Sequence, residues 1–310
     1  MAPFLLVKCP AMLADGGHGI FLPNVSPDLR QHGQGGDHRG MSMAPDRPLS
    51  RLRLSLCWLL LALVLVAGCD RQAQAVSSKE QVFDNQNFRV VRIDLKRETL
   101  SLHWKDPESG EPFGTINALR QWGMTHNRRM LFAANAGIYD RQFAPLGLYV
   151  ENGKTTVPLN LSHGNPASGN FSLLPNGVFA IYPDGHAAVQ TSTAFKAAAK
   201  PTTWASQSGP MLVIDGKLND QFIDDSNSLK WRSGVCAKTP HHVVFAVSEA
   251  PVNFHTFARL FKEELGCRDA LYLDGTISQF YVDGEGYAGA PTFMVKPYAG
   301  IFAVFSQTTP

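Results

Sequence analysis

Short apolar runs separated by turn residues fill the chain from residue 88 onward. Apolar runs of this length are typical of strands, and an Asn-Gly or Asp-Gly pair between two runs is typical of a hairpin. The pattern predicts strands over 88–95, 99–104, 128–134, 146–151, 155–159, 171–174, 178–182, 186–191, 211–214, 242–247 and 270–273, and one or two more within 293–305. The first two should form a hairpin, and a second hairpin should turn at Asn152-Gly153.

Helical spacing of apolar residues is clearest over 253–265, where Gly266 supplies a stop signal. A shorter helix is predicted over 114–124. Because the helix at 253–265 lies between two strands, 242–247 and 270–273, this order favours parallel neighbours joined by a crossover. The predicted class is α+β, with strand-rich mixed sheets and a few helices in a single domain.

The residues before 88 divide into three segments of different character. Residues 1–40 are rich in Gly, His and Pro without a sustained period, which indicates a disordered or mis-called leader. Residues 41–68 place arginines before an apolar run and small residues before Cys69, which predicts a lipoprotein signal with lipidation at Cys69. An ordinary signal peptide or an uncleaved anchor is the alternative. The polar residues 69–87 then form a tether between the lipid and a domain over 88–310.

This interpretation places the domain in the bacterial periplasm, anchored to a membrane, where disulfides form. Of the five cysteines, Cys236 and Cys267 then remain. Paired, they would close a loop of about 30 residues and stabilise the fold by roughly 3–4 kcal/mol. Two buried free thiols are the alternative.

Charge and motif content exclude several functional classes. The formal net charge is +2, and no basic stripe indicates a nucleic-acid partner. No His, Cys and Asp residues have the spacing of a zinc site, and no glycine-rich nucleotide fingerprint is present. We therefore expect no metal and no cofactor. The sequence gives no oligomeric state.

The apolar run 271–273 ends abruptly in Asp274, which is followed by Gly275, a turn and Ser278. A carboxylate at the end of a rigid strand, beside an open loop, is a common arrangement for chemistry. The alternative is that Asp274 only closes a turn.

Other strands end in small and polar residues in the same way. These ends are Asn135-Ala136-Gly137, Gly169-Asn170-Phe171 and Gln207-Ser208-Gly209-Pro210, and Arg232-Ser233-Gly234 adds a cation. Together they offer amides, hydroxyls, a carboxylate and a guanidinium, a set that suits a sugar and a phosphate. A structural ion pair is the alternative role for Arg232.

In their order along the chain, these motifs resemble those of phosphodiester glycosidase domains. The resemblance includes Ile138-Tyr139 and Pro145-Leu146-Gly147-Leu148, covers about residues 88–306, and is greatest to the bacterial branch of the family. The family includes the lysosomal uncovering enzyme, which removes N-acetylglucosamine from a mannose 6-phosphodiester. One motif departs, since the eukaryotic enzymes have Asp-Gly-Gly-Gly-Ser where this chain has Asp274-Gly275-Thr276-Ile277-Ser278.

The resemblance implies a hydrolase that cleaves a sugar C1–O–phosphodiester, of the N-acetylglucosamine-1-phosphodiester type, in envelope or exported glycans. Asp274 would act at the sugar carbon, or as the base that activates water, and Arg232 at the phosphate. The substrate-binding residues would be Asn135, Gly137, Asn170, Ser208, Gly209, Gly275 and Ser278. Candidates for a second carboxylate are Asp140, Glu151 and Asp283. The competing hypothesis is a glycan-binding envelope lipoprotein without catalysis.

Overall fold

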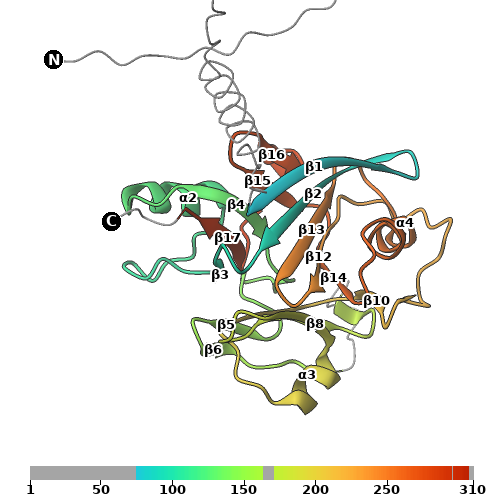
Figure 1. Ribbon diagram of the computed structural model, residues 1–310, viewed down its shortest axis with the longest axis horizontal. Coiled ribbons are helices and arrows are strands. Elements are labelled where there is room, and N and C mark those ends of the chain that lie inside the picture. Colours follow the sequence, from blue (N-terminus) through green and yellow to red (C-terminus); the bar gives the residue numbers. More distant parts are fainter. Residues whose placement is uncertain (1–74, 163–170, 295, 307–310) are drawn as a thin grey trace, which may run out of the picture. The chain divides into compact units, whose positions relative to one another are not determined.

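The computed structural model describes residues 75–162, 171–294 and 296–306, which build three sheets (Figure 1). The leader, the signal, Cys69 and Asn170 lie outside these residues, and their predicted roles stay predictions. Every strand pair among the described residues is antiparallel. The strand-rich α+β class is confirmed. The expected mixture of parallel and antiparallel strands within a sheet is not found among the described residues.

The three sheets interleave distant parts of the chain. The seven-stranded sheet has the order β1-β2-β13-β12-β14-β10-β11, with bounds Val76–Phe83, Gln86–Asp94, His242–Ser248, Ser233–Thr239, Ala270–Asp274, Met211–Ile214 and Lys217–Leu218. A five-stranded sheet has the order β16-β15-β4-β17-β3, with bounds Gly286–Gly289, Gln279–Val282, Met130–Asn135, Ile301–Phe305 and Leu100–His103. The other five-stranded sheet has the order β6-β5-β9-β7-β8, with bounds Lys154–Val157, Tyr149–Glu151, Trp204–Ser208, Gly177–Ile181 and Ala187–Thr191.

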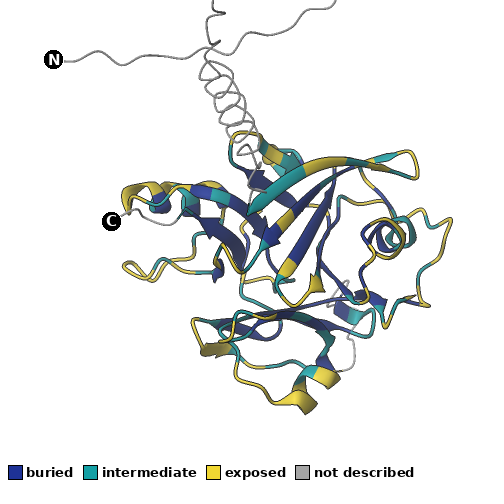
Figure 2. Ribbon diagram, viewed as in Figure 1, coloured by how far each residue is buried: buried dark blue, intermediate teal, exposed yellow. Residues whose placement is uncertain are grey.

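One face of each sheet contributes to a shared apolar core, and the opposite face packs against a smaller apolar cluster. Many strands are therefore apolar on both faces. On β13, Val243, Phe245 and Val247 face this core, whereas Val244 and Ala246 face a second cluster beneath α4. Because strand side chains alternate between faces, a strand covered on both sides has an unbroken apolar sequence. Figure 2 shows the result: the inner strands are mostly buried, while β1 and many connecting loops are intermediate or exposed.

A helix covers the outer face of each sheet (Figure 1). The helices are α2 (Ile116–Thr125), α3 (Ser192–Ala198) and α4 (Phe254–Arg259), and α4 continues as the π-helical turn η2 (Leu260–Glu264). A short 3-10 turn, η3, spans Thr292–Met294. The side chains of Thr115, Thr191 and Asn253 cap the three helices at their N-termini. Among the described residues, no helix has the length and apolarity needed to cross a membrane.

Two predicted strand pairings are wrong. The segments 88–95 and 99–104 do not form a hairpin, because β2 pairs with β1 and β13 whereas β3 pairs with β17 in another sheet. The strands on either side of α4 are not neighbours, because β12 lies between β13 and β14 and pairs antiparallel with both. The connection from β13 through α4 to β14 therefore passes over one intervening strand, β12.

Two segment assignments also change. Strand β1 and the start of β2 occupy part of the expected tether, so strands are present from Val76 and not only from 88. The first of these strands is half exposed at a sheet edge, and its sequence lacks a strong apolar pattern. Residues 171–174 form a short turn instead of a strand.

Candidate active site

Strand ends from all three sheets meet at Asp274. Its strand, β14, pairs with β12, and the register places Asp274 opposite Ser233. At the end of β9, the Ser208 hydroxyl donates to the carbonyl of Leu273 over 2.9 Å. At the end of β4, Asn135 Nδ2 donates to Ser233 Oγ over 3.0 Å. The structure thus brings together three of the strand ends that the sequence singled out.

The Asp274 carboxyl group lies at the boundary between core and solvent. Leu273 before it is fully buried and Thr276 after it is exposed, while Asp274 itself is partly exposed. Burial of the carboxyl group raises the pKa of Asp274 to about 6, against an opposing hydrogen bond of 2.6 Å from the Gly275 amide to Oδ1. A carboxylate with this pKa is ionised at pH 7 and can still accept a proton.

A buried network of hydroxyls and an amide holds the loop that follows Asp274. Ser278 Oγ donates to the Asp274 carbonyl over 2.7 Å and lies 3.0 Å from Ser233 Oγ. The backbone amide of Gln279 donates to Asn135 Oδ1 over 3.1 Å. Because Asn135 and Ser278 are buried and bonded to protein groups, they position Asp274 instead of offering free groups to a sugar. Ser208 is buried and bonded in the same way, so all three residues support the strand ends around Asp274, and their predicted contacts with substrate stay predictions.

Two of the predicted glycines are required by close packing. A Cβ on Gly137 would lie 2.3 Å from the carbonyl oxygen of Gln207, and a Cβ on Gly209 would lie 1.8 Å from Asn176 Oδ1. No side chain fits at those distances without movement of the neighbouring strand ends. Gly275 contributes its amide to Asp274, as described above.

Arg232 does not occupy the predicted position at a phosphate. Its side chain is fully buried, and its guanidinium donates to the carbonyls of Val252 and Ser228 over 2.8 and 2.7 Å. It stacks on the Phe254 ring at 3.6 Å and lies 3.5 Å from the Tyr272 hydroxyl. Burial lowers its pKa. Arg232 therefore anchors the loop before β12 to α4, and no carboxylate among the described residues forms the alternative structural ion pair with it.

Two tyrosines near Asp274 were not among the predicted site residues. Burial, with a further contribution from the Asp274 carboxylate, raises the pKa of Tyr139 and of Tyr298. The Tyr298 hydroxyl donates to the carbonyl of Ile277 over 2.7 Å and so holds the Asp274 loop. Tyr139 is only partly buried, which leaves a neutral phenol near the carboxylate. The sequence signal that could have identified Tyr139 as a site residue was its place at the end of the Asn135–Tyr139 motif.

The departure from the family motif has a simple structural explanation. Ile277 points into the core beneath α2, with 5% of its surface exposed, so its bulk does not fill the space at Asp274. Thr276 is exposed at the turn. Within the described part of the chain, the amide nitrogens of Thr276 and Ile277 have no hydrogen-bond acceptor. The turn after Asp274 therefore holds two backbone amides without a protein acceptor among the described residues.

The three candidates for a second carboxylate have other surroundings. Asp140 Oδ1 accepts from the amides of Gln142 and Ala144 and closes a turn. Asp283 pairs with Arg129 at 2.5 Å. Glu151 lies on β5, where burial raises its pKa. Across the described ranges, no three His, Cys, Asp or Glu side chains gather closely enough to hold a metal ion.

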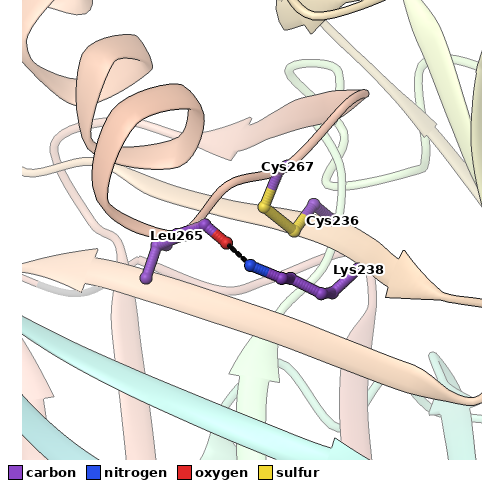
Figure 3. The surroundings of a disulfide bond; sticks show 4 residues. All are labelled: Cys236, Lys238, Leu265 and Cys267. Carbon is purple, nitrogen blue, oxygen red and sulfur yellow. Dashed lines mark hydrogen bonds between the residues drawn. A yellow bond between two sulfur atoms is a disulfide. The ribbon is translucent and has the colours of Figure 1, made fainter.

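A disulfide joins Cys236 to Cys267 with a Cα–Cα distance of 6.2 Å (Figure 3). Cys236 lies on β12 opposite Ala270, so the bond ties β12 to the segment that enters β14. Beside it, Lys238 Nζ donates to the carbonyl of Leu265 at the end of η2 (Figure 3). The disulfide thus fixes the far end of the strand pair whose near end carries Ser233 and Asp274.

Comparison with known proteins places this arrangement among related chains. Residues 128–305 match the family described as phosphodiester glycosidase, and this range contains Asn135, Ser208 and Asp274. The protein described as uncharacterized protein YigE of Escherichia coli (strain K12) is 36% identical over 216 residues, which are 70% of this chain and 81% of that protein.

A solved structure has the same fold. It is the catalytic domain of zebrafish N-acetylglucosamine-1-phosphodiester alpha-N-acetylglucosaminidase, auto-inhibited by its pro-peptide. The match has a TM-score of 0.52 and 14% identity, and covers 75% of this chain and 82% of that one.

Proposed function

Because the chain belongs to the phosphodiester glycosidase family, we propose that it hydrolyses the bond between a sugar C1 and a phosphodiester oxygen. Family membership supports a glycosidase-type hydrolase. The finer part of the proposal is the substrate, a glycoside of the N-acetylglucosamine-1-phosphodiester type in an envelope or exported glycan.

The observation that carries the proposal is the Asp274 carboxylate at a rigid strand end, beside a turn with free amides. Cleavage of a glycosyl bond builds positive charge at C1, and an ionised carboxylate beside that carbon stabilises it. The bond from C1 to the phosphate oxygen breaks with its electron pair on the phosphate. Water forms the new bond to C1, and Asp274 accepts the proton that this water loses.

The leaving phosphate needs charge stabilisation more than a proton, because a phosphodiester becomes a stable phosphate monoester anion. With Arg232 buried, the candidate donors near Asp274 among the described residues are the amides of Thr276 and Ile277, the Thr276 hydroxyl and the Tyr139 phenol. Turn amides that point together are a common binding site for phosphate oxygens. We assign the phosphate to this turn.

The experiment that tests the reaction is hydrolysis in ¹⁸O-labelled water, with UDP-N-acetylglucosamine and a methyl phosphodiester of N-acetylglucosamine 1-phosphate as substrates. Attack at C1 places the label in released N-acetylglucosamine and leaves the phosphate product unlabelled. Label in the phosphate product would contradict cleavage at C1. A protein that binds these compounds without turnover would favour the glycan-binding hypothesis.

The proposed location follows from the sequence before the folded body, where small residues precede Cys69. The protein is proposed to be a lipoprotein whose domain faces the periplasm. Replacing Cys69→Ala should move it from the membrane fraction to the soluble fraction and abolish labelling with a palmitate analogue. Unchanged labelling would contradict lipidation at this residue.

A further inference from the structure

A basic pocket of about 380 Å³ lies where α2 meets the second sheet. Its polar lining consists of Arg120, Asn127, Arg128, Arg129, Tyr281 and Asp283. Three guanidinium groups thus surround one carboxylate, and the lining carries a positive charge.

The single carboxylate leaves two of the arginines available. Asp283 forms a salt bridge with Arg129 over 2.5 Å. Arg120 donates to the Tyr281 hydroxyl over 3.2 Å, and that bond, with Asp283 nearby, raises its pKa. Arg128 lies over the Phe305 ring at 4.7 Å. No described carboxylate lies within salt-bridge distance of Arg120 or Arg128.

One donor in the pocket is unsatisfied. Arg120 Nε is buried and has no hydrogen-bond partner among the described residues. A buried donor without an acceptor is destabilising, and an anionic oxygen in the pocket would satisfy it. Arginine binds phosphate through two parallel N–H bonds, so Arg120 and Arg128 together suit a phosphate group.

Strand β15 connects this pocket to the Asp274 site. Gln279 and Tyr281 lie on the same face of β15, about 7 Å apart along the strand. The backbone amide of Gln279 donates to Asn135 Oδ1 in the network beneath Asp274, whereas the hydroxyl of Tyr281 accepts from Arg120. Tyr287, which is 41% exposed, lies opposite Tyr281 on β16 with ring centroids 5.4 Å apart. Strand β15 therefore contributes both to the network beneath Asp274 and to the arginine pocket.

From this geometry we infer that the pocket around Arg120 and Arg128 binds a second phosphate group of the substrate. The inference rests on the proposed function and names its substrate class: an oligosaccharide or polymer with repeated glycosyl phosphodiester links. One glycosyl phosphodiester link is hydrolysed at Asp274 while the pocket binds the phosphate of a neighbouring unit.

The test compares two synthetic N-acetylglucosamine phosphodiesters, one with a single phosphate and one with two, by isothermal titration with the full chain. Two charge-assisted bonds predict that the second phosphate tightens binding about 10–100-fold. The double variant R120Q/R128Q should lose this advantage. The matched control R268Q, which removes an exposed arginine paired with Asp215, should keep it.

Arg128 also packs on aromatic rings, so the double variant R120Q/R128Q removes packing as well as charge. A second variant that keeps Arg128 is therefore needed. The single variant R120Q replaces one partly buried side chain of α2 with another polar one and leaves Arg128 in place, and it should lose at least about tenfold of the advantage. Equal affinity of wild type for the two ligands, or an advantage retained in R120Q, would overturn the second-phosphate pocket.

Two further readouts separate this inference from its alternatives. If the one-phosphate ligand is hydrolysed but the second phosphate adds no affinity, the pocket assignment fails while the hydrolase stands. If the advantage is present and arginine-dependent without turnover, the pocket stands and the hydrolase fails. Vesicles containing phosphatidylglycerol probe a membrane role. Loss of vesicle binding in R120Q/R128Q with unchanged glycan affinity would assign the arginines to a lipid surface and overturn the inference.

Discussion

The Ser208 hydroxyl donates to the carbonyl of Leu273 over 2.9 Å and ties the end of β9 to the residue before Asp274. Both residues are fully buried, and they belong to different sheets. The position of the carboxylate thus depends on a contact between sheets and not on β14 alone.

Replacing Ser208→Ala should lower the free energy of unfolding by about 1–3 kcal/mol, because the Leu273 carbonyl loses its donor in a buried place. It should also lower kcat, since Asp274 is no longer held. The control is Ser101→Ala, which removes a similar bond, to the carbonyl of Ala303, and should cost stability without changing kcat at a temperature where the variant is folded. Equal kcat in both variants would contradict a positioning role for Ser208.

Arg232 should behave as a structural residue. Arg232→Ala removes donors to two buried carbonyls and empties space against Phe254, which predicts a loss of at least about 3 kcal/mol in the free energy of unfolding. Arg232→Lys should restore part of that stability. Denaturant melts give the stability, and KM is measured well below the melting temperature. A fully stable Arg232→Ala protein with a strongly raised KM would instead return Arg232 to the phosphate.

The strand ends were predictable because their chemistry is local. At Asn135, Ser208 and Asp274, an apolar run stops at a polar residue, and this signal needs no knowledge of strand pairing. The partners of each residue depend on pairing, which the sequence does not reveal. Arg232 shows the difference, since its aromatic and carbonyl contacts come from α4 and the preceding loop.

Strand order was the least predictable part of the fold. The hairpin expected over 88–104 fails because residues 95–99 connect two different sheets. Strand β1 was missed because most of its residues are partly or fully exposed and its apolar alternation is weak. At Ile277, where the motif departs from the eukaryotic enzymes, the side chain's direction toward the core is set by the turn and could not be read from the motif.

The raised pKa of Asp274 predicts a dependence of stability on pH. Between about pH 4 and pH 6 the folded protein holds a proton on Asp274 that the unfolded chain has released, so stability falls as pH rises through this window. Above it, the buried charge costs about 2–3 kcal/mol. Asp274→Asn should therefore be more stable than wild type by about this amount at pH 7 and nearly equal to it at pH 4. Urea melts at both pH values measure the difference, and an equal gain at both would contradict burial as the cause.

The disulfide should contribute strongly to stability. Its sequence separation of 31 residues predicts about 3–4 kcal/mol on the chain-entropy model, or about 6–16 °C in melting temperature for a domain of this size. Reductant should lower the melting temperature of the wild type and leave that of the double variant C236A/C267A unchanged. A melting temperature of the wild type that does not respond to complete reduction, checked by thiol titration, would contradict this role.

In the proposed reaction, the ionised Asp274 carboxylate acts at the sugar carbon. The most direct measurement is kcat/KM for an N-acetylglucosamine-1-phosphodiester between pH 4 and pH 8, in wild type, Asp274→Asn and the control Asp215→Asn, which removes an exposed carboxylate. Wild type and the control should show activity that rises to a plateau with a midpoint near pH 6. Folded Asp274→Asn should be lower by about 10²–10³ at pH 7. Near-normal turnover by folded Asp274→Asn, with the same rise near pH 6, would contradict the claim.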